Sequence, residues 1–304
     1  MMRIVPLILA MIWLSLVPRT AAQDNAQLEI GGGKIEVIFS SAPAEPLRKL
    51  VLGWVASSAR AVTVYYEQFP VSHLQIRLRF FDGHGVRGGR TTGWDGASIE
   101  ISVGRASAAS DFTEDWVLTH EMVHLAFPSV PEEHHWMEEG SATYIEPIAR
   151  ARAGDLTPEK VWGDFVDGLP QGLPQPGDHG LDFTPTWGRT HWGGALFCLL
   201  ADVEIRKRTG NKKGLEDALR AVLKGGGTIE SDWPLTRTLQ IGDGATGVPV
   251  LRELYDKMKG TPAPVDLKEL WKELGVERRN GRIEFNSRAL LAAIRKAITQ
   301  SAVR

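Results

Sequence analysis

The chain has 304 residues, of which 43% are apolar and 24% are charged, and its formal net charge at pH 7 is −2. This length is sufficient for one large domain or for two packed subdomains with a sizeable hydrophobic core. The sequence has no basic patch, and its run Arg206-Lys207-Arg208 is only three residues long, so we expect no nucleic acid as a partner. A single cysteine, Cys198, excludes an intrachain disulfide, and its apolar neighbours indicate that it is buried.

The first 22 residues have the pattern of a secretory signal peptide. Arg3 precedes an apolar run from Ile4 to Val17, and the small residues Ala21 and Ala22 offer a cleavage site. The apolar run is shorter than the roughly 20 residues that cross a bilayer, which favours a cleaved signal over a retained membrane anchor. We therefore expect a secreted or periplasmic protein that has no stable membrane insertion after signal removal.

The next part of the chain alternates between strand and helix patterns. We expect two strands within 28–39 around three glycines, one long helix or two over 45–69, and a strand over 74–81. Residues 82–96 contain six glycines but lack the Gly-Lys-Ser/Thr ending of a phosphate loop, so we expect a mobile loop. The strand pattern over 97–103 predicts a sheet edge that can pair with an extended peptide.

A His-Glu-x-x-His motif lies in the middle of the chain. Two histidines four residues apart share one face of a helix, so His120 and His124 can both reach one zinc ion. Glu121 is offset by about 100° around the helix, which places its carboxylate beside the metal as a general base for water. A His-Glu-x-x-His motif also occurs by chance in proteins. The alternative interpretation is a buried polar helix face or a pseudoenzyme.

The helix that carries this motif has recognisable boundaries. Asp111 and Glu114 have the spacing of a capping box, which predicts that the helix begins at Asp111. Pro128 lies just beyond the motif and predicts an end near Ala126. The motif is therefore expected in the middle of one helix.

A catalytic zinc ion usually has three protein ligands and one open position. A metzincin would have a glycine and a histidine shortly after the motif, where this chain has Phe127 and Val130. We therefore place the third ligand on the next predicted helix, from about 131–135 to around Pro147 or shortly beyond, and select Glu139. The rival ligands on this segment are Glu133, His134, His135 and Glu138.

The remainder of the chain is predicted to be mainly helical. Residues 153–189 are rich in glycine, proline and aspartate and predict an irregular segment, part of which covers the site. Thr190 is expected to cap the first of the later helices. We expect helices over 191–209, 215–223, 250–258, 267–274 and 287–299, and a hairpin over 276–285 that turns at Asn280 and Gly281.

A second motif resembles a known family. Residues 136–144 read Trp-Met-Glu-Glu-Gly-Ser-Ala-Thr-Tyr, which is similar to the Trp-x-x-Glu-Gly-x-Ala-x-Tyr segment of gluzincin (MA-clan) zinc metallopeptidases. The most similar are the catalytic cores of the aminopeptidase N and glycyl aminopeptidase families, and residues 191–206 and 209–217 resemble their later helices. The resemblance implies one catalytic Zn²⁺ ion, with Glu139 as its third protein ligand.

The resemblance also implies a fold. We expect an α+β, zincin-like (thermolysin-type) catalytic domain with a mixed strand and helix N-terminal layer and a mainly helical C-terminal half. The expected boundaries are a signal peptide at 1–22, an N-terminal α/β zincin subdomain with the motif helix at 23–130, and a mainly helical C-terminal subdomain with the third ligand at 131–304.

This chain departs from those families at two places. Their tyrosine that polarises the substrate carbonyl corresponds to His191, whose imidazole can also donate a hydrogen bond to a developing oxyanion. The sequence has no counterpart of the Gly-x-Met-Glu-Asn motif that binds a free amino terminus. Aminopeptidase specificity therefore does not carry over to this chain.

Together these features predict an exported zinc-dependent metallopeptidase that acts on a peptide or protein substrate. The predicted catalytic residues are Glu121 and His191, and the predicted metal ligands are His120, His124 and Glu139. The alternative is a non-catalytic zincin-fold binding protein of the cell envelope. Glu121 favours the enzyme, because metal binding alone does not require it.

Overall fold

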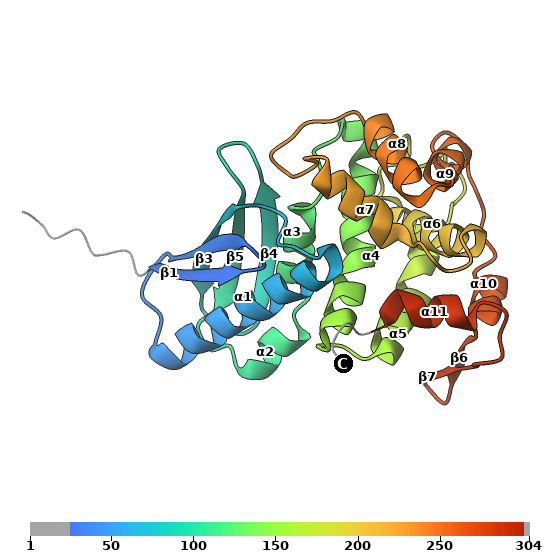
Figure 1. Ribbon diagram of the computed structural model, residues 1–304. Helices are drawn as coiled ribbons and strands as arrows, with labels where there is room; N and C mark the ends of the chain where they lie inside the picture. The colour runs from blue at the N-terminus through green and yellow to red at the C-terminus, as the bar shows by residue number, and fades with distance from the viewer. Residues whose placement is uncertain (1–24, 301–304) are drawn as a thin grey trace, which may run out of the picture.

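A five-stranded mixed sheet organises the first part of the computed structural model, which describes residues 25–300 (Figure 1). The predicted signal peptide at 1–22 lies outside the described residues. β2, β3 and β5 run parallel, whereas β1 and β4 form the two edges in antiparallel pairs. In sheet order the strands are β1 (Asn25–Ile30), β2 (Gly33–Phe39), β3 (His73–Phe81), β5 (Ser98–Gly104) and β4 (Val86–Thr92).

Alternating apolar and polar residues bury one face of this sheet. Val37, Ile76 and Ile99 lie side by side on the three parallel strands, and all three are fully buried. The long helix α1 (Glu45–Tyr66) connects β2 to β3 and packs against β1 and against the helices that follow the sheet. The strand and helix patterns therefore produce the predicted N-terminal layer.

The sheet edge nearest the motif differs from the prediction. Residues 82–96 are not a loop throughout, because they contain β4, which pairs with β5 and makes β5 an interior strand. The pairing shifts register between Arg87 and Gly89, and Gly88 has a φ of +52°. This bulge interrupts the alternation by which a strand is recognised in sequence. The edge strand that contacts the motif helix is thus 86–92 and not 97–103.

The motif helix is shorter than predicted. The chain leaves the helical conformation at Asp115, whose carboxylate accepts hydrogen bonds from the backbone N–H groups of Val117 and Leu118, each 3.2 Å long. Asp111 lies inside the preceding helix, where it accepts from the backbone of Ala108 at 2.7 Å. The prediction that Asp111 caps the motif helix is wrong, because the motif helix begins after Asp115 as a second, separate helix. The two helices are α2 (Ala109–Glu114) and α3 (Val117–His124).

Helix α4 (His135–Ala153) runs through the centre of the molecule, between the sheet and the later helices (Figure 1). It follows a short 3-10 turn, Glu132–His134, and contacts α1, α3 and α6. The predicted end, around Pro147 or shortly beyond, is too early, since the helix continues to Ala153. Gly154 follows it with a left-handed φ of 89°. Most of its last two turns is buried, so packing maintains the helix past the proline.

The rest of the chain is mainly helical, as predicted. Two helices were not predicted: α5 lies in the segment expected to be irregular, and α8 has two glycines and three threonines, which lower helix propensity. Thr190 lies inside a π-helix and does not cap α6. The elements are α5 (Pro158–Gly168), a 3-10 turn (Leu169–Gly172), the π-helix (Gly188–Gly193), α6 (Gly194–Arg208), α7 (Leu215–Lys224), α8 (Leu235–Thr246), α9 (Val250–Met258), α10 (Leu267–Leu274), β6 (Val276–Arg279), β7 (Arg282–Phe285) and α11 (Ala292–Thr299).

The hairpin of β6 and β7 turns where the sequence predicted it. Asn280 and Gly281 have φ values of 51° and 76°, the positive angles that a two-residue type I′ turn requires. Within residues 25–300, no helix is long and apolar enough to cross a membrane.

Candidate metal centre

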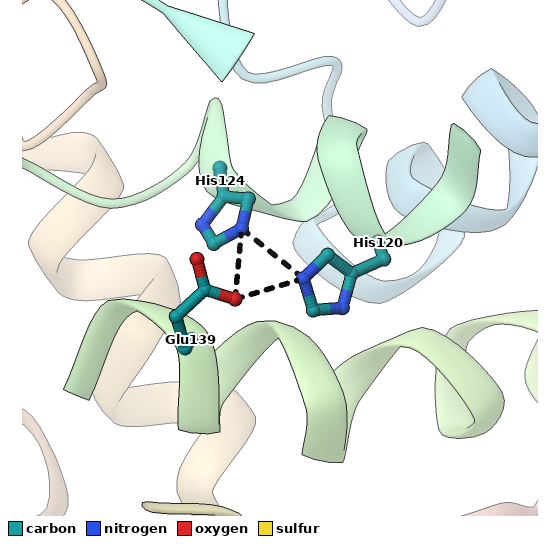
Figure 2. A group of neighbouring side chains, drawn as sticks. All are labelled: His120, His124 and Glu139. Atoms are coloured by element: carbon teal, nitrogen blue, oxygen red, sulfur yellow. Dashed lines mark hydrogen bonds and ion pairs between the residues drawn. The ribbon is translucent and has the colours of Figure 1, made fainter. Parts of the chain in front are cut away.

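Three side chains converge between α3 and α4 (Figure 2). His120 and His124 project from adjacent turns of α3, and Glu139 faces them from α4. Nε2 of His120 lies 3.2 Å from Nε2 of His124 and 3.2 Å from Oε2 of Glu139. Nε2 of His124 lies 3.7 Å from the same carboxylate oxygen. The structure therefore brings together the three residues predicted as metal ligands.

The spacing and the chemistry of these atoms fit one zinc ion. Ligand atoms about 2.0–2.2 Å from a tetrahedral ion lie about 3.3–3.6 Å from one another, close to the separations found in this cluster. Two imidazole nitrogens and one carboxylate oxygen form a donor set of catalytic zinc sites, which keep a fourth position open.

Burial and neighbouring charge control the protonation of two members of the cluster. Burial, together with the charge of His120, lowers the pKa of His124 to about 3, so its imidazole is neutral at neutral pH. Burial acts to raise the pKa of Glu139, but hydrogen bonds from His120 and His191 outweigh it and hold that pKa well below its usual range. A neutral imidazole and an ionised carboxylate are the forms that bind a metal.

Glu121 lies against the edge strand β4. The hydroxyl of Thr91 donates to Oε2 of Glu121 at 2.6 Å and lies 2.9 Å from its backbone oxygen. A Cβ atom on Gly89 would overlap the same carboxylate, so a larger residue at this position would displace the Glu121 side chain. Burial raises the pKa of Glu121 above its usual value, and the Thr91 hydrogen bond opposes the shift. Gly89 and Thr91 were not predicted as site residues, because their segment was expected to be a loop.

His191 reaches the cluster from the π-helix. Its Nε2 lies 3.2 Å from Oε2 of Glu139, and its Nδ1 lies 3.2 Å from the backbone oxygen of Trp187. A neutral imidazole has one N–H, so both oxygens receive a hydrogen bond only when His191 is protonated. The ring also stacks on Trp187, with 5.0 Å between the ring centroids.

A close helix crossing places His191 beside Glu139. Gly140 follows Glu139 on α4, and a Cβ atom there would overlap the backbone of Gly194 at the start of α6. A Cβ atom on Gly194 would in turn overlap the backbone oxygen of Trp136. The two glycines therefore allow α4 and α6 to approach closely, which brings the π-helix to the cluster.

The rival third ligands do not join the cluster. Glu138 accepts from the backbone of Val130 at 2.7 Å, and His134 contacts Asp182 at 3.1 Å. Glu133 is exposed. His135 is the nearest, with its Nε2 3.5 Å from Oε1 of Glu139, the oxygen that does not face the two histidines of α3.

Glu146 is a buried carboxyl on the same side of α4 as Glu139, and it was not singled out from the sequence. Nδ1 of His120 is buried and has no hydrogen-bond partner among the described residues. Glu146 is close enough for the charge of His120 to lower its pKa, although burial raises that pKa to about 7 against the opposing effect of Arg150. Glu146 lies seven residues after Glu139 and so on the same face of α4, a spacing that could have identified it.

Solved structures share this architecture, whereas no protein-family model and no curated protein matches the chain. An aminopeptidase N family protein from Idiomarina loihiensis matches with a TM-score of 0.62 and 15% identity, over 84% of this chain and 49% of that one. A mutant M1 zinc metallopeptidase from Deinococcus radiodurans matches with a TM-score of 0.53 and 16% identity, over 79% of this chain and 52% of that one. This chain has the fold of the M1 zinc metallopeptidases.

The M1 fold confirms two expectations from the sequence. The chain resembles the aminopeptidase N core, at low identity, and its mixed sheet and helices confirm the zincin-like α+β class. The Deinococcus radiodurans mutant in complex with a Tyr-Ser-Ala substrate also matches, with a TM-score of 0.53 and 16% identity over 80% of this chain and 53% of that one. The chain spans about half the length of these solved structures.

Proposed function

We propose that this chain is a zinc-dependent metallopeptidase, exported to a secreted or periplasmic location, that hydrolyses peptide bonds in a peptide or protein substrate. The main support is the convergence of His120, His124 and Glu139 on one point, with Glu121 on the same helix beside the edge strand β4. The M1 fold adds support, because the solved structures that share it are described as zinc metallopeptidases.

His120, His124 and Glu139 would hold the zinc ion through the two Nε2 atoms and a carboxylate oxygen. Bound there, zinc would supply a Lewis acid for the scissile carbonyl and lower the pKa of a water molecule. The Glu121 carboxylate takes a proton from the attacking water and then delivers it to the leaving amine. The raised pKa of Glu121 suits this double role, since it brings the proton affinity of the carboxylate closer to neutral pH.

His191 is the second catalytic residue in this proposal. It lies beside Glu139, and its Nε2 can donate a hydrogen bond to the oxygen of the scissile carbonyl as negative charge develops there. The contact between Nδ1 and the backbone of Trp187 orients the ring for that donation. His191 would then have the role of the tyrosine in the families that the sequence resembles.

Replacement of Glu121 tests the proposal. The zinc-loaded wild type should hydrolyse a mixed peptide library, and a chelator should abolish that activity. Glu121→Gln should lower hydrolysis by about 10³-fold at unchanged zinc content, because the amide cannot accept the proton. Glu29→Gln, an exposed change on the far edge strand β1, is the matched control and should leave the rate unchanged. Full activity in Glu121→Gln would contradict the proposal.

The same assay tests His191. His191→Phe should lower kcat by about 10- to 100-fold, because it removes the donor to the oxyanion. His191→Tyr should retain more activity than His191→Phe, since the phenol hydroxyl can donate instead. Equal activity in the two variants would assign His191 a packing role. Zinc binding without any peptide hydrolysis in the wild type would favour a non-catalytic envelope protein.

A further inference from the structure

A cavity of about 770 Å³ opens beside His120 and His191. It extends along α4 and α5, and neither β4 nor Glu121 contributes to its lining in the described chain. Thr143, Glu146 and Arg150 form part of its lining along α4. They follow Glu139 by 4, 7 and 11 residues, so the face of α4 that carries Glu139 continues into the cavity. The cavity is thus continuous with the candidate metal centre.

Aromatic side chains line the end of the cavity nearest His120 and His191. Trp116 packs edge-on against His120 with 5.4 Å between centroids, and Trp187 stacks on His191 at 5.0 Å. These tryptophans are 52% and 61% exposed, which leaves large apolar surfaces open to a ligand. Trp192 adds a third indole to the lining.

The third indole has a fixed position. A Cβ atom on Gly168 would overlap the six-membered ring of Trp192, and a Cβ atom on Gly172 would overlap its backbone. Glycine at both positions lets α5 and the following 3-10 turn pack directly on this tryptophan. This part of the cavity wall is therefore preformed, which lowers the entropic cost of binding a ligand there.

Most charged residues of the cavity contact an oppositely ionisable side chain within the protein. Glu114 is exposed to solvent at the cavity rim. Three pairs hold the other charges, so none of them is free to bind a charged group of a substrate. The pairs are Arg150 with Glu146 at 2.8 Å, Lys160 with Asp164 at 2.6 Å, and Arg278 with Asp167 at 2.7 Å.

We propose that this cavity binds a bulky apolar side chain of the substrate, an aromatic one above all, next to the scissile bond. The inference rests on the proposed peptidase function and specifies its substrate class. Apolar surface on both partners favours binding by its removal from water, and indole rings add offset or edge-to-face contacts with an aromatic ligand. The volume lies in the range of pockets that enclose small ligands, so a tryptophan side chain can enter fully.

The test uses blocked tetrapeptide amides that are all alanine except for one tryptophan, leucine or alanine, placed at each position in turn. At the best position, kcat/KM of the zinc-loaded wild type should be at least about 100-fold higher for tryptophan than for alanine. Equal values for tryptophan and alanine at every position would overturn the inference.

Variants that fill the cavity test whether the preference for tryptophan depends on this cavity. Thr143→Trp should reduce the tryptophan-to-alanine ratio of kcat/KM by at least about 10-fold. Thr236→Trp, an exposed change on α8 outside the cavity, is the matched control and should preserve the ratio. Gln171→Trp fills the cavity from an exposed position and guards against misfolding of the first variant. An unchanged ratio in both cavity variants would overturn the assignment to this cavity.

Binding to the inactive protein separates the inference from the proposed function. Calorimetric titration of zinc-loaded Glu121→Gln with the same peptides should give a Kd at least about 10-fold lower for tryptophan than for alanine. Selective binding without hydrolysis by the wild type would support the cavity assignment and contradict the peptidase. Hydrolysis without any selectivity would support the peptidase and overturn the cavity assignment.

Discussion

The β4 side of the cluster formed by His120, His124 and Glu139 is closed, whereas its α5 side is open. On the closed side, Thr91 and Gly89 enclose the Glu121 carboxylate, and a single added methyl group would overlap it. On the open side, the cavity of about 770 Å³ leaves room for a ligand. A proton acceptor needs one fixed position, while recognition of a side chain needs space. In the function proposed above, the closed side carries the chemistry and the open side selects the substrate.

Gly89→Ala should disrupt the closed side of the cluster. The added Cβ would overlap the Glu121 carboxylate and displace it, which should lower kcat/KM by about 100-fold at unchanged zinc content. Gly244→Ala on α8 is the matched control, because a Cβ there meets no atom within 4 Å. A rate in Gly89→Ala equal to that of Gly244→Ala would show that the enclosure of Glu121 has no catalytic role.

Glu146→Gln tests the raised pKa of the buried carboxyl group on the open side. Burial raises the pKa of Glu146 to about 7, whereas an unfolded chain loses this proton near about pH 4.3. Between these values the folded state holds a proton that the unfolded state has released, so the wild type loses stability as pH rises. Relative to Glu146→Gln, the free energy of unfolding of the wild type should fall by about 2 kcal/mol from pH 5 to pH 7.

Denaturant unfolding of both proteins at the two pH values measures this difference. Glu29→Gln on the exposed face of β1 should show no such dependence on pH. A stability difference between wild type and Glu146→Gln that stays constant with pH would contradict a raised pKa for Glu146.

The two histidines of the motif helix and the third candidate ligand could be predicted because helical spacing is local. Two histidines four residues apart need only one helix to share a face, and the Glu-Gly pair of α4 supplied the resemblance that selected Glu139. Strand β4 could not be recognised, since its glycines and its bulge remove the alternation, and its pairing with β5 depends on the folded sheet.

The cavity could not be predicted for a similar reason. Trp116 and Trp187 are 71 residues apart in the chain, and only the crossing of α4 with α6 brings the π-helix beside α3. Their indoles gave no periodic signal that distinguishes them from the other tryptophans. Glu146 is different, because its spacing from Glu139 was visible but its burial was not.

Zinc stoichiometry tests the central claim most directly. The protein would be stripped with a chelator, dialysed against limiting zinc, and measured by elemental analysis together with Glu139→Ala and Glu138→Ala. We expect one zinc ion per chain in the wild type and in Glu138→Ala, and at least about a 10-fold weaker affinity in Glu139→Ala, which lacks one of three protein ligands. Equal zinc affinity in Glu139→Ala and the wild type would contradict a metal centre built from His120, His124 and Glu139.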